Sequence, residues 1–264
     1  MDLELRGRRA VVTGGSRGIG REIARQLAIE GAGVAIVARG LEALQATAAE
    51  LGGESASRVH AIRCDTGSDD SVRAMVVAAV EHLGGLDVLV NCAAQPGGQA
   101  PPPKLPQIDD EVFWPDINVK VMGYLRCIRE SLPHLRPGSR IVNVSGLAAR
   151  STGSTIGSMR NVAVAAMTKN LADELGPKGI SVVCVHPGLT RTERTADVLR
   201  SQSERRGVSS EDVERDMARS TVLNRLLDAR EVAWVVTFLC SPRAVAINGD
   251  SIAAGGGQPG SIHY

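Results

Sequence analysis

Three glycines near the amino terminus have the spacing of a phosphate-binding turn. Gly14, Gly18 and Gly20 follow the apolar run Ala10–Val12 and open an amphipathic stretch at residues 21–30. Glycine permits a tight turn, a close approach of the backbone to phosphate and close packing of helix on strand. The start of that helix would bind a pyrophosphate through backbone N–H groups. A purely structural turn is the alternative, but the position between a first strand and a first helix favours a dinucleotide site.

The end of the second apolar run bears on which dinucleotide is bound. A carboxylate about 20 residues beyond the glycines would accept hydrogen bonds from the adenosine ribose 2′-hydroxyl. The chain instead reads Val37-Ala38-Arg39 there. Arg39 and Arg17 are both placed to meet a 2′-phosphate, which a guanidinium binds in a bidentate way. The sequence therefore predicts NADP(H) in preference to NAD(H); in the alternative interpretation, Arg39 only caps a loop in solvent.

The glycine turn and Arg39 follow two different apolar runs, so they can share one site only if the ends of these runs lie side by side in a sheet. Short apolar runs are predicted as strands at Ala10–Val12, Val34–Ala38, Val59–Arg63, Leu86–Val90, Arg140–Val144, Ser181–Val185 and Ser251–Ala254. Helical patterns lie between them at residues 21–30, 41–51, 69–83, 111–134 and 159–175. The alternation indicates an α/β fold, a single Rossmann-like, doubly wound parallel sheet of about seven strands with helices on both faces. Ligands of such sheets bind at the carboxyl ends of the strands.

The length of 264 residues and the hydrophobic content of 43% suit one domain over residues 1–264. Two segments depart from the alternation of strands and helices. Residues 95–106 are rich in proline and glycine, follow the fourth strand and are expected to border the cofactor. Residues 190–221 are polar and follow the sixth strand, so they are predicted to form a lid over a substrate pocket.

Charge and composition argue against several classes of protein. A net charge of +1, with basic and acidic residues interspersed, gives no reason to expect a nucleic-acid or anionic membrane surface. The five cysteines are widely separated and lack metal-binding spacing, so we expect reduced thiols and no metal site. No apolar stretch suits a secretion signal or a membrane span. A cytoplasmic protein with a small-molecule substrate is therefore expected.

Several motifs, in the same order, resemble the short-chain dehydrogenase/reductase family over nearly the whole chain. They are Thr13-Gly14-x-x-x-Gly18-x-Gly20, Cys64-Asp65, Asn91-Cys92-Ala93-Ala94, His186-Pro187-Gly188 with Thr190 and Thr192, and the closing segment from Asn248-Gly249 to Gly256-Gly257. The resemblance implies a single Rossmann-like domain. It also implies a homo-oligomer, a tetramer or a dimer, assembled through the long helices at 111–134 and 159–175.

The same motifs imply which residues contact the cofactor. Asp65 corresponds to an adenine contact, and the segment from Pro187 to Thr192 to one that holds the nicotinamide amide. The expected cofactor residues are Gly14, Ser16, Arg17, Gly18, Ile19, Gly20, Arg39, Asp65, Asn91, Ala93, Pro187, Gly188, Thr190 and Thr192.

The resemblance further implies a catalytic tyrosine, lysine, serine and asparagine. The tyrosine is the general acid or base on the substrate oxygen, and the lysine lowers the pKa of its phenol. Counting back from Met167–Leu175 places Gly157 at the tyrosine position and Asn161 at the lysine position, and neither can do that chemistry. The usual serine aligns best with Gly146, so its neighbour Ser145 is the surviving candidate. A serine that only caps the backbone is the alternative for Ser145.

Counting back from Leu132 places Lys120 at the asparagine position. Asn118 is offset by two residues and would face elsewhere on a helix. Lys120 would then stand at the expected asparagine position and Asn161 at the expected lysine position. The ammonium of Lys120 could still reach the site, from another helix. Ser145, Lys120 and Asn161 are therefore the candidate catalytic residues.

Other polar side chains have weaker claims to a catalytic role. Tyr124 lies four residues after Lys120 on the same helical face, where a core or subunit contact is the expected role. Ser154 and Ser158 flank the missing tyrosine. His186 could shuttle protons, but its place before the proline–glycine pair favours a structural role.

Two hypotheses follow. The first is an NADP(H)-dependent oxidoreductase that reduces a carbonyl or oxidises an alcohol of a small apolar substrate. The cofactor would carry the hydride, and the proton would come from Ser145, Lys120 or a water. The alternative is a catalytically inactive NADP(H)-binding sensor or partner subunit. Loss of both the tyrosine and the lysine favours the second hypothesis, whereas the exchanged lysine and the intact nicotinamide segment favour the first.

Overall fold

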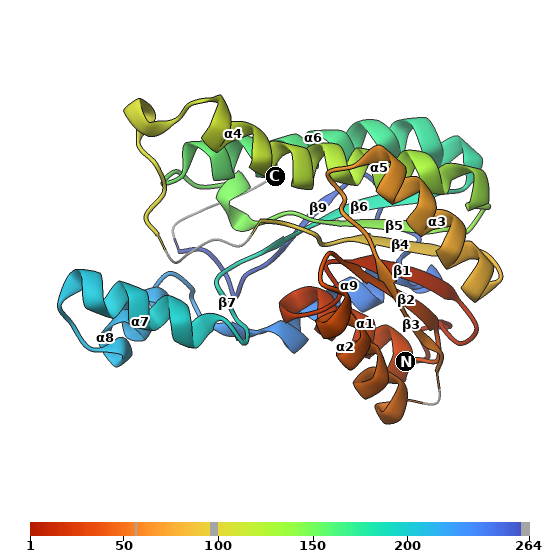
Figure 1. Cartoon of the computed structure of the whole chain (residues 1–264), viewed down its shortest axis with the longest axis horizontal. Coiled ribbons are helices and arrows are strands. Elements are labelled where there is room, and N and C mark those ends of the chain that lie inside the picture. Colours follow the sequence, from red (N-terminus) through yellow and green to blue (C-terminus); the bar gives the residue numbers. More distant parts are fainter. Residues whose placement is uncertain (56, 96–99, 260–264) are drawn as a thin grey trace.

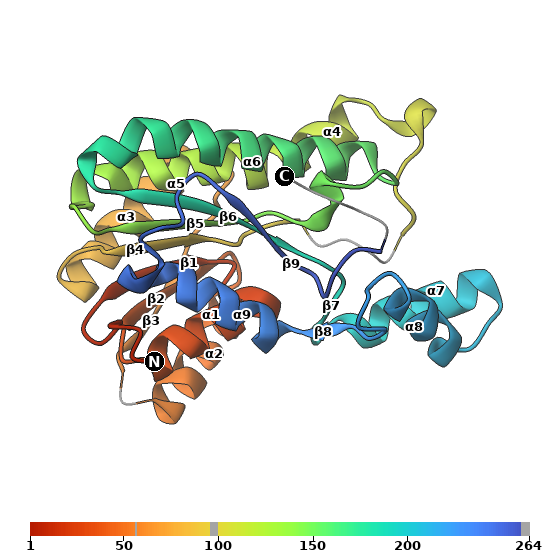
Figure 2. The same ribbon diagram turned by 180° about the vertical axis from the view of Figure 1, so that it is seen from behind.

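The computed structural model describes residues 1–55, 57–95 and 100–259. Within these ranges, seven parallel strands form one sheet in the order β3-β2-β1-β4-β5-β6-β9 (Figures 1 and 2). They are β1 (Arg9–Thr13), β2 (Gly33–Ala38), β3 (Val59–Arg63), β4 (Val88–Asn91), β5 (Arg140–Val144), β6 (Ser181–Pro187) and β9 (Ser251–Ala254). A second, two-stranded sheet pairs β7 (Thr190–Arg191) with β8 (Leu227–Asp228). The predicted α/β fold with a seven-stranded parallel sheet is confirmed.

Helices cover both faces of the sheet (Figures 1 and 2). One face carries α1 (Gly18–Ile29), α2 (Leu41–Glu54) and α9 (Ala229–Cys240), and the other carries α3 (Asp69–Leu83), α5 (Gly123–Ser131) and α6 (Thr155–Leu175). Successive strand side chains alternate between two apolar cores: Val12 packs with the α1 and α9 side, and Val11 with the α3 and α5 side. Both faces of the strands are therefore buried, which explains their unbroken apolar runs.

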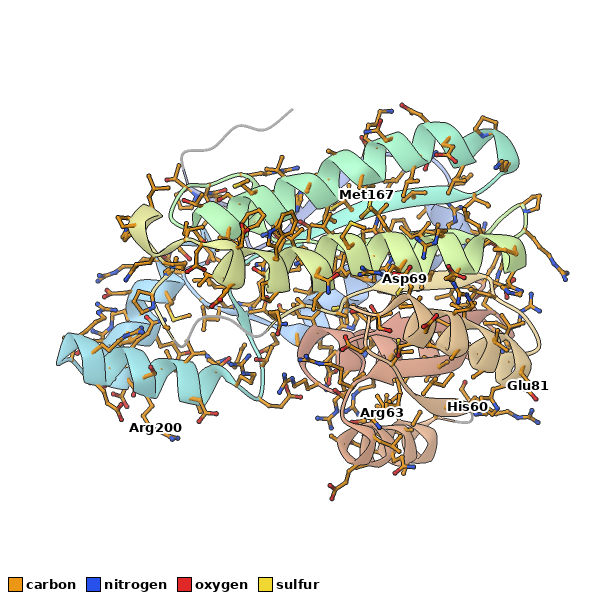
Figure 3. All side chains as sticks on the ribbon, turned by 45° about the horizontal axis from the view of Figure 1, so that its top comes forward. His60, Arg63, Asp69, Glu81, Met167 and Arg200 are labelled. Carbon is orange, nitrogen blue, oxygen red and sulfur yellow. The ribbon has the colours of Figure 1, made fainter. Side chains whose placement is uncertain are left out.

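The helix predicted at 111–134 is interrupted. It consists of α4 (Asp110–Ile117), a π-helical turn over Asn118–Met122, and α5. A π turn inserts one extra residue into a helix, and here Lys120 is buried within it. Arg126 of α5 holds the turn, because its guanidinium donates to the Asn118 carbonyl at 3.1 Å. The same guanidinium pairs with Asp69 of α3, the residue labelled in Figure 3. Apolar periodicity does not reveal such a turn.

Helix α6 begins four residues before its predicted start. Ser154 is its N-cap and accepts a hydrogen bond from the Gly157 N–H at 3.1 Å, which satisfies one of the free donors of the first turn. The predicted lid segment contains α7 (Thr195–Arg206) and α8 (Ser210–Ala218), which lie beyond the carboxyl ends of the strands (Figure 1). None of the helices in the described part of the chain is long and apolar enough to cross a membrane.

Candidate active site

A cavity of about 1080 Å³ lies at the carboxyl ends of the strands. The strand order reverses between β1 and β4, which is where sheets of this class bind ligands. Most of the residues predicted for the site line this cavity: Gly14, Ser16, Arg17, Gly18, Ile19, Gly20, Arg39, Asp65, Ala93, Lys120, Ser145, Asn161, Pro187, Gly188 and Thr192. Of the predicted loop at 95–106, Gln95 lines the cavity, while residues 96–99 lie outside the described residues.

Two predicted cofactor residues lie behind the cavity wall. Asn91 is fully buried in β4, and its Nδ2 donates to Asn143 Oδ1 at 3.0 Å. The Thr190 hydroxyl donates to the Gly188 carbonyl at 3.0 Å and closes a local turn. The structure therefore places Asn91 and Thr190 as supports of strand and turn rather than as wall residues.

The glycine turn is shaped by close backbone contacts. Gly14 has a φ of +69°, and a Cβ at this position would lie 2.9 Å from the Cys92 carbonyl oxygen. A Cβ at Gly20 would lie 2.3 Å from the Gly14 carbonyl oxygen. Thr13 joins the two strand ends, because its hydroxyl accepts the N–H groups of Cys92 and Ala93 at 3.0 and 3.2 Å. Only glycine fits this turn, and the result is the backbone cradle that a dinucleotide pyrophosphate requires.

The part of the cavity at the end of β2 carries exposed positive charge. Arg39 follows β2 and Arg17 is the N-cap of α1; both side chains are exposed, and neither forms an ion pair within the described residues. The Asp65 carboxylate accepts the Gly67 N–H at 2.9 Å. With no acidic residue at the end of β2, this wall suits a 2′-phosphate better than a free ribose hydroxyl.

Lys120 supplies a buried ammonium to the opposite part of the cavity. The side chain is 5% exposed, and its Nζ donates to the Ser145 carbonyl oxygen at 2.8 Å. No carboxylate bonds to it within the described residues. Burial, and then the charge of Arg160, lower the pKa of Lys120 to about 8. Lys120 is therefore a group that can release or take up a proton near neutral pH.

The Ser145 hydroxyl is engaged with the backbone. Its Oγ donates to the Asn161 carbonyl at 3.0 Å, at the start of α6. A hydroxyl whose hydrogen is held in this way can still accept a hydrogen bond but is not free to donate one. This geometry matches the alternative interpretation of Ser145 as a capping serine.

Asn161 lines the cavity, but its side-chain oxygen is buried. The residue is 3% exposed, and its Oδ1 has no hydrogen-bond partner within the described residues. A Cβ at Gly146 would lie 2.9 Å from Asn161 Nδ2, so Asn161 fills the space that a serine at position 146 would need. The replacements at the expected serine and lysine positions are therefore sterically matched to each other.

The expected tyrosine position is closed in a similar way. A Cβ at Gly157 would lie 2.8 Å from the Ser154 Oγ that caps the helix. The Ser158 hydroxyl donates to the Ser151 carbonyl at 2.9 Å. Both hydroxyl candidates beside the missing tyrosine therefore hold the start of α6.

An ion pair that sequence reasoning missed borders this region. Arg160 Nη1 lies 2.6 Å from both carboxylate oxygens of Asp116, and the pair joins α6 to α4. Arg160 also lines the cavity. Its place three residues after Gly157 was a signal, since residues at that spacing share a helical face, but its partner lies 44 residues away in the chain.

Tyr124 and His186 are both core residues. Tyr124 is fully buried and donates to the Val144 carbonyl at 2.8 Å, and burial raises the pKa of its phenol well above the usual value. His186 is 1% exposed within β6. Neither residue lines the cavity. In the ranges that the structure describes, no group of three or more His, Cys, Asp or Glu side chains is arranged to hold a metal ion.

Comparison of the sequence with known proteins agrees with this architecture. The profile of the family described as Enoyl-(Acyl carrier protein) reductase matches residues 14–258. The short-chain reductase protein NovJ of Streptomyces niveus is 34% identical over 253 residues, covering 95% of this chain and 93% of that protein. A putative ketoacyl reductase of Streptomyces coelicolor is 34% identical over 259 residues, covering 94% of this chain and 95% of that protein.

Solved structures are similar over almost the whole chain. L-Sorbose reductase from Gluconobacter frateurii, crystallised with NADPH and L-sorbose, has a TM-score of 0.91 at 28% identity and covers 99% of this chain and 100% of its own. A short chain dehydrogenase from Burkholderia cenocepacia, crystallised with NADP, has a TM-score of 0.83 at 32% identity, with coverage of 96% and 98%.

Proposed function

Since the chain belongs to the short-chain dehydrogenase/reductase family, we propose that it is an oxidoreductase that uses NADP(H) and acts on a carbonyl or alcohol group of a small apolar substrate. One observation carries the proposal: the buried ammonium of Lys120 lies on the same cavity as the glycine turn. Hydride transfer to a carbonyl needs a proton source close to the cofactor, and Lys120 can supply it.

Two observations support NADP(H) over NAD(H). Arg39 and Arg17 line the cavity without an ion pair in the described ranges, and the end of β2 carries no carboxylate. Two similar proteins were crystallised with NADPH or NADP. A guanidinium pair binds a phosphate dianion more strongly than a neutral hydroxyl.

When bound, the nicotinamide supplies or accepts the hydride; the chain must handle the proton. The Ser145 carbonyl holds the Lys120 ammonium toward the cavity. In the reductive direction, this ammonium donates a proton to the substrate oxygen as negative charge develops there. Asn161 also lines the cavity, and its carboxamide is not an acid or base near neutral pH, so it would position a ribose or substrate hydroxyl rather than protonate it.

The substrate would occupy the end of the cavity next to α6. Leu147 and Ala148, in a short helical turn that contacts α6, are apolar residues of the cavity lining, as is Leu189. Ser220 and Thr221 also line the cavity and belong to the end of residues 190–221. These contacts support the proposal that residues 190–221 act as a lid.

A specific feature favours a second candidate, an inactive NADP(H)-binding sensor or partner subunit. The Ser145 hydroxyl is committed to the Asn161 carbonyl, and Gly157 offers no side chain. The site would then bind the dinucleotide but lack a substrate-orienting hydroxyl. The two candidates differ in turnover and not in cofactor binding.

We also propose a homo-oligomer, a tetramer or a dimer, built on α4 and α6. Large apolar side chains are exposed on these helices and the π turn: Val112, Trp114, Met122, Met159 and Val162. A patch of exposed apolar side chains on two neighbouring helices is typical of a subunit contact.

Calorimetric titration with NADPH and NADH, followed by an absorbance assay of NADPH oxidation with a panel of ketones, aldehydes and quinones, tests the proposal. We expect preferential NADPH binding and turnover with at least one carbonyl class. NADPH binding without turnover across the panel would favour the inactive sensor, and absence of any dinucleotide binding would overturn both candidates.

A further inference from the structure

A carboxylate from the lid segment sits on the glycine turn. Glu193 Oε2 accepts the N–H of Gly18, the first residue of α1, at 3.0 Å, and Glu193 Oε1 accepts from Arg21 Nη1 at 3.1 Å. Gly18 and Glu193 are 175 residues apart in the chain. Glu193 also lines the cavity beside Ser16 and Ile19 of the turn.

The start of α1 has no carboxylate of its own. Its first turn contains no acidic residue, and its N-cap, Arg17, makes no side-chain capping bond. A helix N-terminus carries partial positive charge and attracts an anion. The two donors that now bind Glu193, a backbone N–H and a guanidinium, are also the donors that suit a phosphate oxygen. Glu193 therefore uses the Gly18 N–H that a dinucleotide pyrophosphate would need, while Arg21, which also pairs with Glu50, holds the other oxygen of the carboxylate.

We propose that Glu193 is an autoinhibitory carboxylate: it holds the pyrophosphate position in the ligand-free protein and must leave when the dinucleotide binds. The proposal rests on the dinucleotide site of the proposed function. Glu193 and a pyrophosphate are both anionic, so they repel at hydrogen-bonding distance and cannot share one N–H group. The cofactor affinity that is measured is then lowered by the fraction of molecules in which Glu193 occupies the turn.

The contact also links cofactor binding to the lid. Glu193 lies between Thr192, whose N–H donates to Thr195 Oγ1 at 2.8 Å, and the start of α7. Thr192 packs near the turn as well, since a Cβ at Gly18 would lie 3.4 Å from Thr192 Cγ2. Displacement of Glu193 therefore removes a contact that ties the start of the segment 190–221 to the glycine turn. Dinucleotide binding and the position of this segment are coupled in this way.

Two variants and one control test the proposal. Glu193→Gln keeps the size of the side chain and removes its charge, and Glu193→Ala removes both. Calorimetric titration should give a Kd for NADPH that is lower by roughly threefold or more in both variants. Glu204→Gln removes an exposed carboxylate from α7 and should leave the Kd unchanged. An unchanged or raised Kd for NADPH in both Glu193 variants would overturn this proposal. Binding of NADPH by the wild type in the same titration would still support the proposed function.

Hydrogen–deuterium exchange of the ligand-free protein tests the contact without any cofactor. A peptide spanning residues 14–20 should exchange faster in Glu193→Ala than in the wild type or in Glu204→Gln, because the Gly18 N–H loses its acceptor. Equal exchange would show that the contact is not formed in solution and would overturn the proposal. If the wild type and all variants bind no dinucleotide, the proposed function fails, and this inference fails with it.

Discussion

The cavity has two walls, the glycine turn and the start of α6, and they present different chemical groups to it. The glycine turn acts through backbone groups, and its key requirement is the absence of side chains at Gly14 and Gly20. The wall at the start of α6 acts through side chains, and there Gly157 and Asn161 replace the tyrosine and lysine that the family resemblance implies. Substitutions elsewhere in the cavity leave the backbone groups of the glycine turn in place, whereas they directly change a site that consists of side chains. The proposed function therefore predicts that cofactor binding and proton transfer can be separated by mutation.

The walls also differ in how charge is handled. Arg39 and Arg17 are exposed on the first wall and form no ion pair among the residues that the structure describes. On the second wall, Arg160 is paired with Asp116, whereas the buried Lys120 donates to a backbone carbonyl. Exposed charge can bind a charged ligand at little cost, whereas buried charge changes its own proton affinity. The first arrangement suits recognition and the second suits chemistry.

The sharpest test of the separation is Lys120→Met. Without the ammonium, NADPH-dependent reduction should fall by roughly 100-fold or more, while the Kd for NADPH stays unchanged by calorimetry. Lys169→Met, which removes an exposed lysine paired with Asp173, is the matched control and should keep full activity. Wild-type turnover in Lys120→Met would exclude Lys120 as the proton donor.

Lys120→Met should also stabilise the protein. Burial lowers the pKa of Lys120 from 10.5 to about 8, so the unfolded state binds this proton more tightly than the folded state. The charged form therefore costs stability below pH 8, and the wild type gains stability as the pH rises from about 8 to 10.5. Urea unfolding at pH 7 should give Lys120→Met a free energy of unfolding about 1–3 kcal/mol above that of the wild type. A less stable variant would contradict the view of Lys120 as a costly buried charge.

On the other wall, Arg39→Asp should weaken NADPH binding by roughly tenfold or more and spare NADH, because it replaces the 2′-phosphate partner with a like charge. Arg63→Asp changes an exposed arginine at the end of the neighbouring strand β3, outside the cavity, and is the matched control. Calorimetry with both nucleotides measures the preference. If Arg39→Asp kept the preference for NADPH over NADH, Arg39 would not be the partner of the 2′-phosphate.

The pH dependence of reduction offers a finer test of the second wall. Activity that needs the Lys120 ammonium should be present below the pKa of about 8 and decline as the pH rises above it. Arg160→Gln removes a nearby positive charge that lowers this pKa, so the decline should move to higher pH. Arg160→Lys keeps the charge and should keep the profile. Superimposable profiles for Arg160→Gln and the wild type would separate Arg160 from the proton donor.

The smallest expected effect concerns the support of the glycine turn. Thr13→Val removes the acceptor of two N–H groups and should lower the free energy of unfolding by about 1 kcal/mol in urea denaturation. Thr237→Val is a matched control, because the buried Thr237 Oγ1 has no hydrogen-bond partner within the described residues. Equal losses in the two variants would mean that the Thr13 hydroxyl does not hold the strand ends together.

The sequence predicted the first wall better than the second for a physical reason. Apolar runs and glycine spacing act over a few neighbouring residues, so the strands, the turn and the fold class could be predicted. The Arg160–Asp116 pair and the Glu193 contact with Gly18 depend on how distant elements pack, and no local pattern marks them. The π turn around Lys120 was missed because the chain is helical on both sides of it, at Ile117 and Gly123, and apolar periodicity does not mark one inserted residue.

Two other misses had local signals. Helix α9 was not predicted, although Asp228 and Glu231 form a capping box at its start. Helix α8 starts at a similar serine cap, in which Ser209 accepts the Asp212 N–H at 3.1 Å. Both signals could have been found by searching for caps before apolar periodicity.

The edge strand β9 has a consequence for the order in which the protein can be completed during translation. β9 is synthesised after every other strand of the sheet, yet it pairs with β6, and the Gly188 N–H donates to its Ala254 carbonyl at 3.3 Å. The next residue, Gly255, packs so closely on Gly188 that a Cβ at Gly188 would lie 2.8 Å from the Gly255 Cα. A nascent chain can therefore form the glycine turn early, but the part of the cavity lined by Gly188 and Gly255 stays incomplete until the last strand leaves the ribosome.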